Sequence, residues 1–160
     1  MQFSEKQLGE LFIQNYKLED YLPLKRFRTS RLRHETEKPT LEDTRADYVV
    51  SWPNRLLWVV EFKIVADPGA IKQALEYYDC FQYDFDPLFF SLGKVSIAAQ
   101  FFREDTIFFA QRLGVELIQI SPINYKSATI NLITRDRKIT DTELNTRIKG
   151  FKQLYGVARG

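Results

Sequence analysis

The pattern of apolar and polar positions is most informative in the ten residues from Leu56 to Val65. All of them are apolar except Glu61 and Lys63, which is the pattern of a strand covered on both faces. Because side chains alternate between the two faces of a strand, Glu61 and Lys63 point the same way. An ionised group buried without a partner is costly, so these two charges require a rim position, mutual pairing, or a metal or substrate.

A shorter apolar run precedes this strand. It comprises Tyr48, Val49 and Val50, and it follows directly on Asp47. The turn signal Pro53-Asn54 separates the two runs, so together they predict a hairpin. Such a hairpin can bring Asp47 beside Glu61.

The remaining periodicity predicts an α/β fold. The expected elements are a helix capped by Ser4 with Leu8, Leu11 and Phe12 as its apolar stripe, a helix from Asp67 to about Gln82, a strand over 95–101, a helix over 104–113, strands over 115–120 and 128–134, and a helix from Asp141 to about Tyr155. The order strand, helix, strand over 95–120 indicates a parallel crossover. We therefore expect residues 1–160 to form a single domain with a central mixed β-sheet flanked by helices.

Length and composition narrow the class of protein. A chain of 160 residues with 44% hydrophobic content can bury one sizeable core but leaves little room for a separate recognition domain. The lone Cys80 and lone His34 argue against a disulfide framework, a cysteine zinc cluster and a catalytic triad. The sequence also shows no signal peptide, membrane span or glycine-rich phosphate loop, so we expect an intracellular, cytoplasmic protein.

The two apolar runs carry a resemblance to a known family. Asp47, the turn, and then Glu61-Phe62-Lys63 resemble the D…ExK core of the PD-(D/E)xK nuclease superfamily, which includes restriction and homing endonucleases, junction resolvases and repair nucleases. Ala46 stands where the motif's name has proline, a position that is often replaced in the family. The resemblance covers roughly residues 5 to 120 and implies a restriction-endonuclease-like fold.

The resemblance also implies a reaction, the hydrolysis of phosphodiester bonds with Mg²⁺ as cofactor, for which Mn²⁺ can substitute. Mg²⁺ prefers oxygen ligands and keeps several waters, and the implied protein ligands are Asp47, Glu61 and the backbone carbonyl of Phe62. Lys63 would lie close to the attacking water, where a positive charge favours hydroxide.

Outside the core, three polar helix residues resemble further family positions. Glu10, in the N-terminal helix, would orient an attacking water or a second metal, although a solvated helix acid explains it equally well. Gln73 and Tyr77 are four residues apart and share a helix face. The family would aim that face at the active site or at the DNA backbone, and the alternative is a polar face that meets water.

DNA affinity would have to come from local clustering of charge, because the net charge is only +2. The candidate DNA-binding residues in one basic segment are Lys25, Arg26, Arg28, Arg31 and Arg33. A bulge or turn near Thr29-Ser30 would bring the arginines to one surface, as a basic ribbon that fits the major groove. The alternative is pairing with the nearby acidic residues. We expect the stretch from His34 to Asp43 to be a loop near the mouth of the active site.

The leading prediction is a Mg²⁺-dependent endodeoxyribonuclease that cuts double-stranded DNA at a specific sequence. We expect at least a homodimer, because two symmetry-related subunits are the simplest way to cut both strands. One alternative is a structure-selective nuclease such as a Holliday-junction resolvase. Resolvases of this superfamily typically carry a glycine- and serine-rich stretch after the first helix, and the segment Arg28–Arg31 contains no glycine, which weakens this alternative. Another alternative is a non-catalytic DNA-binding or assembly protein, against which Asp47, Glu61 and Lys63 argue.

Overall fold

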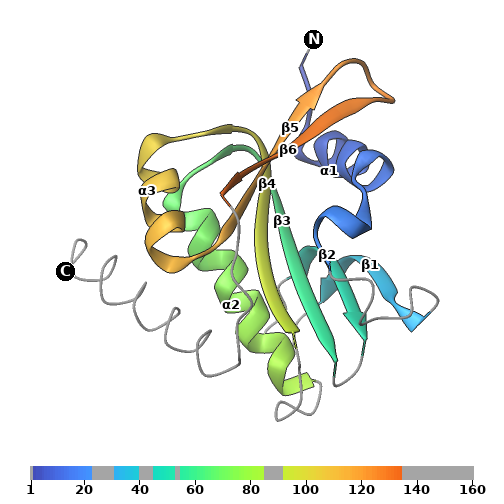
Figure 1. Cartoon of the computed structure of the whole chain (residues 1–160), viewed down its shortest axis with the longest axis vertical. Helices are drawn as coiled ribbons and strands as arrows, with labels where there is room; N and C mark the ends of the chain where they lie inside the picture. Colours follow the sequence, from blue (N-terminus) through green and yellow to red (C-terminus); the bar gives the residue numbers. More distant parts are fainter. Residues whose placement is uncertain (1, 23–30, 40–44, 53–54, 85–91, 135–160) are drawn as a thin grey trace.

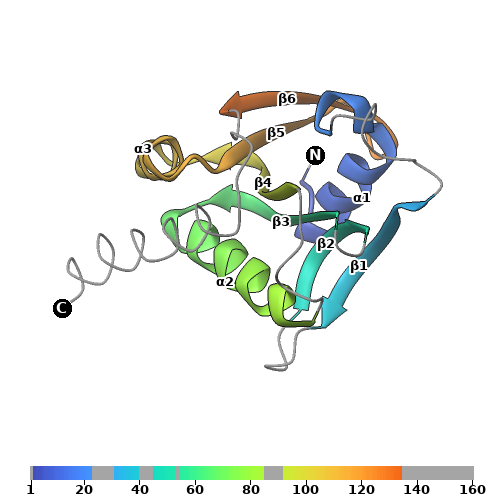
Figure 2. The ribbon, with the colours of Figure 1, turned by 60° about the horizontal axis from the view of Figure 1, so that its bottom comes forward.

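The computed structural model describes residues 2–22, 31–39, 45–52, 55–84 and 92–134. In this part of the chain a six-stranded sheet, in the order β1-β2-β3-β4-β5-β6, carries helices on both faces (Figures 1 and 2). The elements are α1 (Glu5–Asn15), a 3₁₀ turn (Leu18–Asp20), β1 (Arg33–Pro39), β2 (Arg45–Trp52), β3 (Leu56–Ala66), α2 (Pro68–Asp84), β4 (Leu92–Phe102), α3 (Glu104–Leu113), β5 (Glu116–Pro122) and β6 (Ala128–Thr134). The predicted α/β class is confirmed.

The sheet is mixed because its two halves are connected differently. Strands β3, β4 and β5 run parallel and are linked through α2 and α3, whereas β1, β2 and β6 pair antiparallel with their neighbours. A parallel neighbour requires a crossover that returns the chain to the same end of the sheet. The parallel crossover expected over 95–120 is therefore confirmed.

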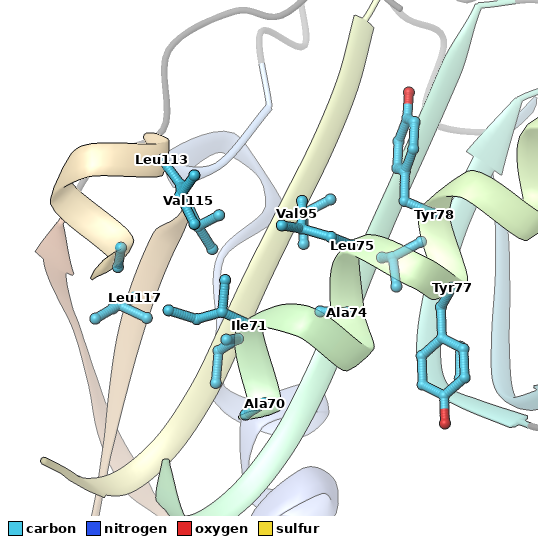
Figure 3. Close-up of a cluster of buried hydrophobic side chains, with 14 of the residues drawn as sticks. Ala70, Ile71, Ala74, Leu75, Tyr77, Tyr78, Val95, Leu113, Val115 and Leu117 are labelled. Carbon is cyan, nitrogen blue, oxygen red and sulfur yellow. The ribbon is translucent and has the colours of Figure 1, made fainter. Parts of the chain in front are cut away.

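The strand β3 is covered on both faces, as its apolar sequence predicts. Trp58 and Val60 belong to the hydrophobic cluster that includes Leu8 and Phe12 of α1. Leu57 and Val59 belong to the other cluster, which includes Ile71, Ala74 and Leu75 of α2 together with Val95 and Leu117, and Figure 3 shows these α2 side chains directed toward β4 and β5. The two faces of β3 thus alternate as expected.

The helix ends follow the capping signals in the sequence. Ser4 Oγ accepts from the Gln7 N–H at 3.1 Å, and Gln7 Oε1 accepts from the Ser4 N–H at 2.9 Å, which is a capping box at the start of α1. Asp67 Oδ1 accepts from the Ala70 N–H at 3.1 Å at the start of α2. The helix α3 ends at Gly114, whose φ of 68° is the left-handed conformation that glycine adopts readily.

One expectation is wrong. Residues 34–39 do not form a loop but belong to β1, which pairs antiparallel with β2 from Arg33↔Ser51 to Pro39↔Arg45. Its side chains are exposed or half-buried throughout, because β1 lies at one end of the strand order, where charged residues are common. A strand with no buried face has no hydrophobic alternation, and its sequence reads as a loop. The helix expected over 141–155 lies outside the described residues.

No helix in the described ranges is both long and apolar enough to cross a membrane.

Candidate active site

The site begins where β2 and β3 separate. Their last paired residues are Tyr48 and Val60, and the next residues along the two strands are Asp47 and Glu61. Beyond this point the Phe62 N–H donates to Asp47 Oδ2 at 2.8 Å. From here β2 continues alongside β1 while β3 continues alongside β4. The predicted hairpin is therefore confirmed, and it brings Asp47 beside Glu61 at the point of the fork.

Glu61 is a buried carboxyl group with an unused oxygen. The residue is 3% exposed, and its Oε2 atom has no hydrogen-bond partner in the described part of the chain. Burial raises the pKa of Glu61 to about 10, and a hydrogen bond with the Asp47 carboxyl and the charge of Asp47 add to this effect. At neutral pH, without a bound cation, Glu61 therefore retains its proton.

A second buried carboxylate shows that the fold can satisfy such a group fully. Glu116 is 1% exposed, but its Oε2 lies 3.0 Å from Lys94 Nζ and its Oε1 accepts from Ser96 Oγ at 3.1 Å. Lys94 also donates to the Tyr21 carbonyl at 2.6 Å. Each oxygen of Glu116 thus has a partner, which sets the unpartnered oxygen of Glu61 apart.

Lys63 lies two residues after Glu61 on the same strand. Its Nζ is 3.9 Å from Glu5 Oε1, and its side chain is 27% exposed. The Lys63 charge lowers the pKa of Glu61, although by less than burial and Asp47 raise it. The fork therefore combines two carboxyl groups with an accessible ammonium group.

Glu5 is a member of this site that the sequence analysis did not select. It is the first residue of α1, where an acidic side chain is ordinarily explained by the helix dipole. The available signal was spacing, because Glu5, Gly9 and Ile13 recur every four residues on one helix face. All three line a pocket beside the fork.

This pocket has a volume of about 520 Å³ and lies between α1, β1 and the point of the fork. Its lining residues are Glu5, Lys6, Gly9, Glu10, Ile13, Thr36, Glu37, Asp47 and Phe62. Glu10 and Asp47 thus line the same pocket, and the role that the resemblance implies for Glu10 stays a prediction. Glu37 falls between the pairs Thr36↔Tyr48 and Lys38↔Ala46, opposite Asp47, and its φ of 48° is unusual for a residue other than glycine.

Gly9 allows α1 to approach the fork closely. A Cβ atom on Gly9 would lie 2.6 Å from Cδ2 of the Phe62 ring, and Phe62 is buried. The Phe62 ring lies 5.6 Å from that of Phe12 and stacks at 6.3 Å on that of Tyr48, so it has little freedom to move. The missing side chain of Gly9 therefore sets the distance between α1 and β3.

We predict that Gly9→Ala destabilises the protein. Overpacking of this kind typically costs ~1–3 kcal/mol, and over most of this range the cost exceeds the gain of ~1 kcal/mol in helix propensity that alanine would bring. Chemical denaturation measures the difference. Gly69→Ala is the matched control, because a Cβ atom there would meet only the Asp67 side chain, at 3.2 Å. Equal stability of the two variants would contradict close packing at Gly9.

Gln73 and Tyr77, the two polar residues of α2 that the sequence pattern indicates, lie on the α2 side of the site. Gln73 Nε2 donates to the Tyr77 hydroxyl at 2.7 Å, as their spacing predicts. Burial raises the pKa of Tyr77, and the nearby Glu61 carboxylate is the next cause. Figure 3 shows Tyr77 pointing away from Tyr78. Tyr77 is only 7% exposed, so a contact with DNA would be made by its hydroxyl group. That contact stays a prediction.

The basic segment is described only in part. Lys25, Arg26 and Arg28 lie outside the described residues. Arg31 and Arg33 are exposed and flank the buried Leu32, so they are available to a ligand. The basic ribbon stays a prediction.

The donor set of the fork suits a hard cation that retains water. In the described ranges no group of three or more His, Cys, Asp or Glu side chains is placed to hold a metal. Asp47 and Glu61 supply two carboxyl groups, and the Oε2 atom of Glu61 has no hydrogen-bond partner among the described residues. Mg²⁺ is usually held by one or two carboxylates, with waters completing its shell. The described residues of the fork therefore fit Mg²⁺ that keeps several of its waters.

Comparisons with known proteins do not name a family. No family model and no curated protein matches the sequence. Among solved structures, the SPO1766 protein of unknown function from Silicibacter pomeroyi is similar, with a TM-score of 0.38 and 10% sequence identity over 99% of this chain and 90% of that chain. A similarity at this level carries no inference about function.

Proposed function

We propose that this protein is a Mg²⁺-dependent nuclease that hydrolyses phosphodiester bonds at the fork between β2 and β3. The observation that carries the proposal is the buried Oε2 of Glu61, which lacks a partner in the described ranges and belongs to a carboxyl group beside that of Asp47. The same fold provides a partner for each oxygen of Glu116. We therefore attribute the unpartnered oxygen of Glu61 to a site for a cation.

The residues of the fork would divide the chemistry among them. Asp47, Glu61 and the Phe62 carbonyl would hold the cation. Bound Mg²⁺ would neutralise charge on the phosphate and acidify a water for attack. The Lys63 ammonium group, 27% exposed, would donate a hydrogen bond to the attacking oxygen and stabilise its negative charge.

Neighbouring residues would position these groups. Glu5, 3.9 Å from Lys63, would hold the ammonium group in place. The hydrogen bond from the Phe62 N–H fixes one oxygen of Asp47 and leaves the other for the cation. Glu10, across the pocket, would bind a water of the cation's shell. The Gln73–Tyr77 pair would approach the phosphate from the α2 side.

The proposed substrate is double-stranded DNA, cut at a specific sequence by a homodimer. The D…ExK resemblance supports DNA, and the exposed Arg33, at the start of β1, and Arg31, two residues before it, support contacts to its backbone. The first test is incubation of the wild-type protein with supercoiled plasmid, a random linear DNA pool and four-way junctions, with Mg²⁺ or with EDTA. Discrete Mg²⁺-dependent ends, mapped by sequencing, are expected. Uncut substrates in every reaction would contradict the proposal and favour a binding module.

A further inference from the structure

An exposed apolar patch lies beside the proposed catalytic lysine. It consists of Val65 and Phe101, which are 50% and 54% exposed. Val65 and Phe101 are register partners on the adjacent parallel strands β3 and β4, so their side chains are neighbours on one surface. Figure 1 shows the two strands running side by side toward the end from which α2 and α3 depart. We call this surface the Val65–Phe101 patch.

The patch is continuous with the fork. Lys63 and Val65 are two residues apart on one strand, which places them roughly 6.6 Å apart along it and on the same face. Glu61 lies two residues before Lys63 on β3 and therefore points to the same face. A polymer whose phosphate is bound at Glu61 and Lys63 would therefore bring its next unit to the patch.

The patch is also held rigidly. The Ala66 carbonyl, at the end of β3, accepts from the Arg103 N–H at 3.2 Å and from Thr106 Oγ1 at 2.8 Å. Thr106 is buried, so the ends of β3 and β4 are fixed to the start of α3. An exposed aromatic ring on an anchored stretch of backbone can receive a flat ligand at a lower cost in conformational entropy than a ring on a mobile loop.

We propose, on the basis of the nuclease function above, that the Val65–Phe101 patch is a stacking platform for an unpaired base next to the phosphate that is cut. A nucleobase is flat and apolar on its faces, so it suits Phe101, while its phosphate suits the Lys63 charge. Bases of an intact duplex are stacked on each other and would have to leave the stack to reach the platform. The substrate class is therefore double-stranded DNA that presents an unpaired nucleotide at the cut, such as a junction or a gap.

Binding to the Lys63→Ala protein tests the platform without cleavage. The probes are single-stranded and gapped oligonucleotides that carry 2-aminopurine, with a fully paired duplex for comparison. Stacking on an aromatic ring quenches 2-aminopurine fluorescence, so we expect quenching on binding. Adding Phe101→Ala should remove the quenching and weaken binding to the unpaired probes by ~5–150-fold, which is the effect typical of one base–aromatic stack. Binding to the duplex should change less.

The matched control is Phe108→Ala, which removes a similarly exposed phenylalanine, 52% against 54%, from α3. Phe101→Trp should retain quenching, and Phe101→Leu, which lacks an aromatic face, should not. Equal effects of Phe101→Ala and Phe108→Ala would overturn the platform. Loss of a dimer in Phe101→Ala with unchanged probe binding would overturn it in favour of a contact between copies of the chain.

The outcome is separable from that of the nuclease proposal. Wild-type cleavage with no effect of Phe101→Ala on binding or on the preferred substrate would leave the nuclease and remove the platform. Phe101-dependent quenching without wild-type cleavage of any substrate would leave the platform and remove the nuclease.

Discussion

Replacing Lys63 by alanine is expected to slow DNA cleavage by ~10²–10⁴-fold, the range typical of a group that assists proton transfer in the transition state. The Lys63 side chain is partly exposed and lies two residues after Glu61 on β3, so its ammonium group can reach a phosphate bound there. Its loss removes a charge that acts on the attacking oxygen but leaves both carboxyl groups in place. Single-turnover cleavage in Mg²⁺ measures the effect.

DNA binding separates this role from simple attraction of the phosphate. We expect Lys63→Ala to bind DNA within a few-fold of wild type, because one phosphate contact contributes only part of the total electrostatic attraction. Lys72→Ala is the matched control. Lys72 is a surface lysine of α2 whose Nζ lies 3.9 Å from Glu76, and its replacement should leave cleavage unchanged. Equal cleavage by the two variants would remove Lys63 from the mechanism.

The stability of the cation-free protein is expected to fall as the pH rises. The folded-state pKa of Glu61, about 10, is higher than its ordinary value of 4.5, so the folded state holds a proton that the unfolded state releases. The resulting stabilisation is complete below about pH 4.5 and is lost as the pH rises toward 10. Between the two values the slope is ~1.4 kcal/mol per pH unit for one proton.

Urea denaturation in EDTA between pH 7 and 9 measures this slope. The window lies above the ordinary pKa of His34, which burial lowers further, and below that of tyrosine. Glu61→Gln should flatten the slope because glutamine carries no proton to lose, and Glu76→Gln, on the surface of α2, should not. If the slope persists in Glu61→Gln, a titrating group other than Glu61 causes it.

Mg²⁺ should counteract this loss of stability. A cation competes with the proton for the Glu61 carboxyl group, so its affinity should rise with pH. A ligand that binds only the folded state raises the free energy of unfolding. We therefore expect Mg²⁺ to raise the melting temperature more at pH 8 than at pH 5.

The sequence predicts those elements whose signals are local. The Ser4 cap, the bounds of α3 and the antiparallel pairing of β2 with β3 all depend on residues close in the chain, and the structure agrees with them. The adjacency of Asp47 and Glu61 was predicted for the same reason, because a hairpin with a short connection leaves little choice of register.

Other features could not be found because they depend on tertiary position. Strand β1 has no buried face, so it shows no alternation. Glu5 is explained locally by the start of α1, and only the packing of that helix brings it to Lys63. Phe101 occurs in an apolar strand, and such a sequence predicts burial rather than the 54% exposure that the structure shows.

The most direct test of the proposed active site is Mg²⁺ binding by calorimetry at pH 8 to the wild type, Glu61→Gln and Glu76→Gln. The neighbouring carboxyl groups of Asp47 and Glu61, with one buried oxygen of Glu61 unpartnered, should bind the cation in the wild type and in Glu76→Gln. Glu61→Gln should bind it at least tenfold more weakly, because a neutral amide replaces one of two anionic ligands. Equal binding by all three proteins, or binding by none, would contradict a cation site at the fork.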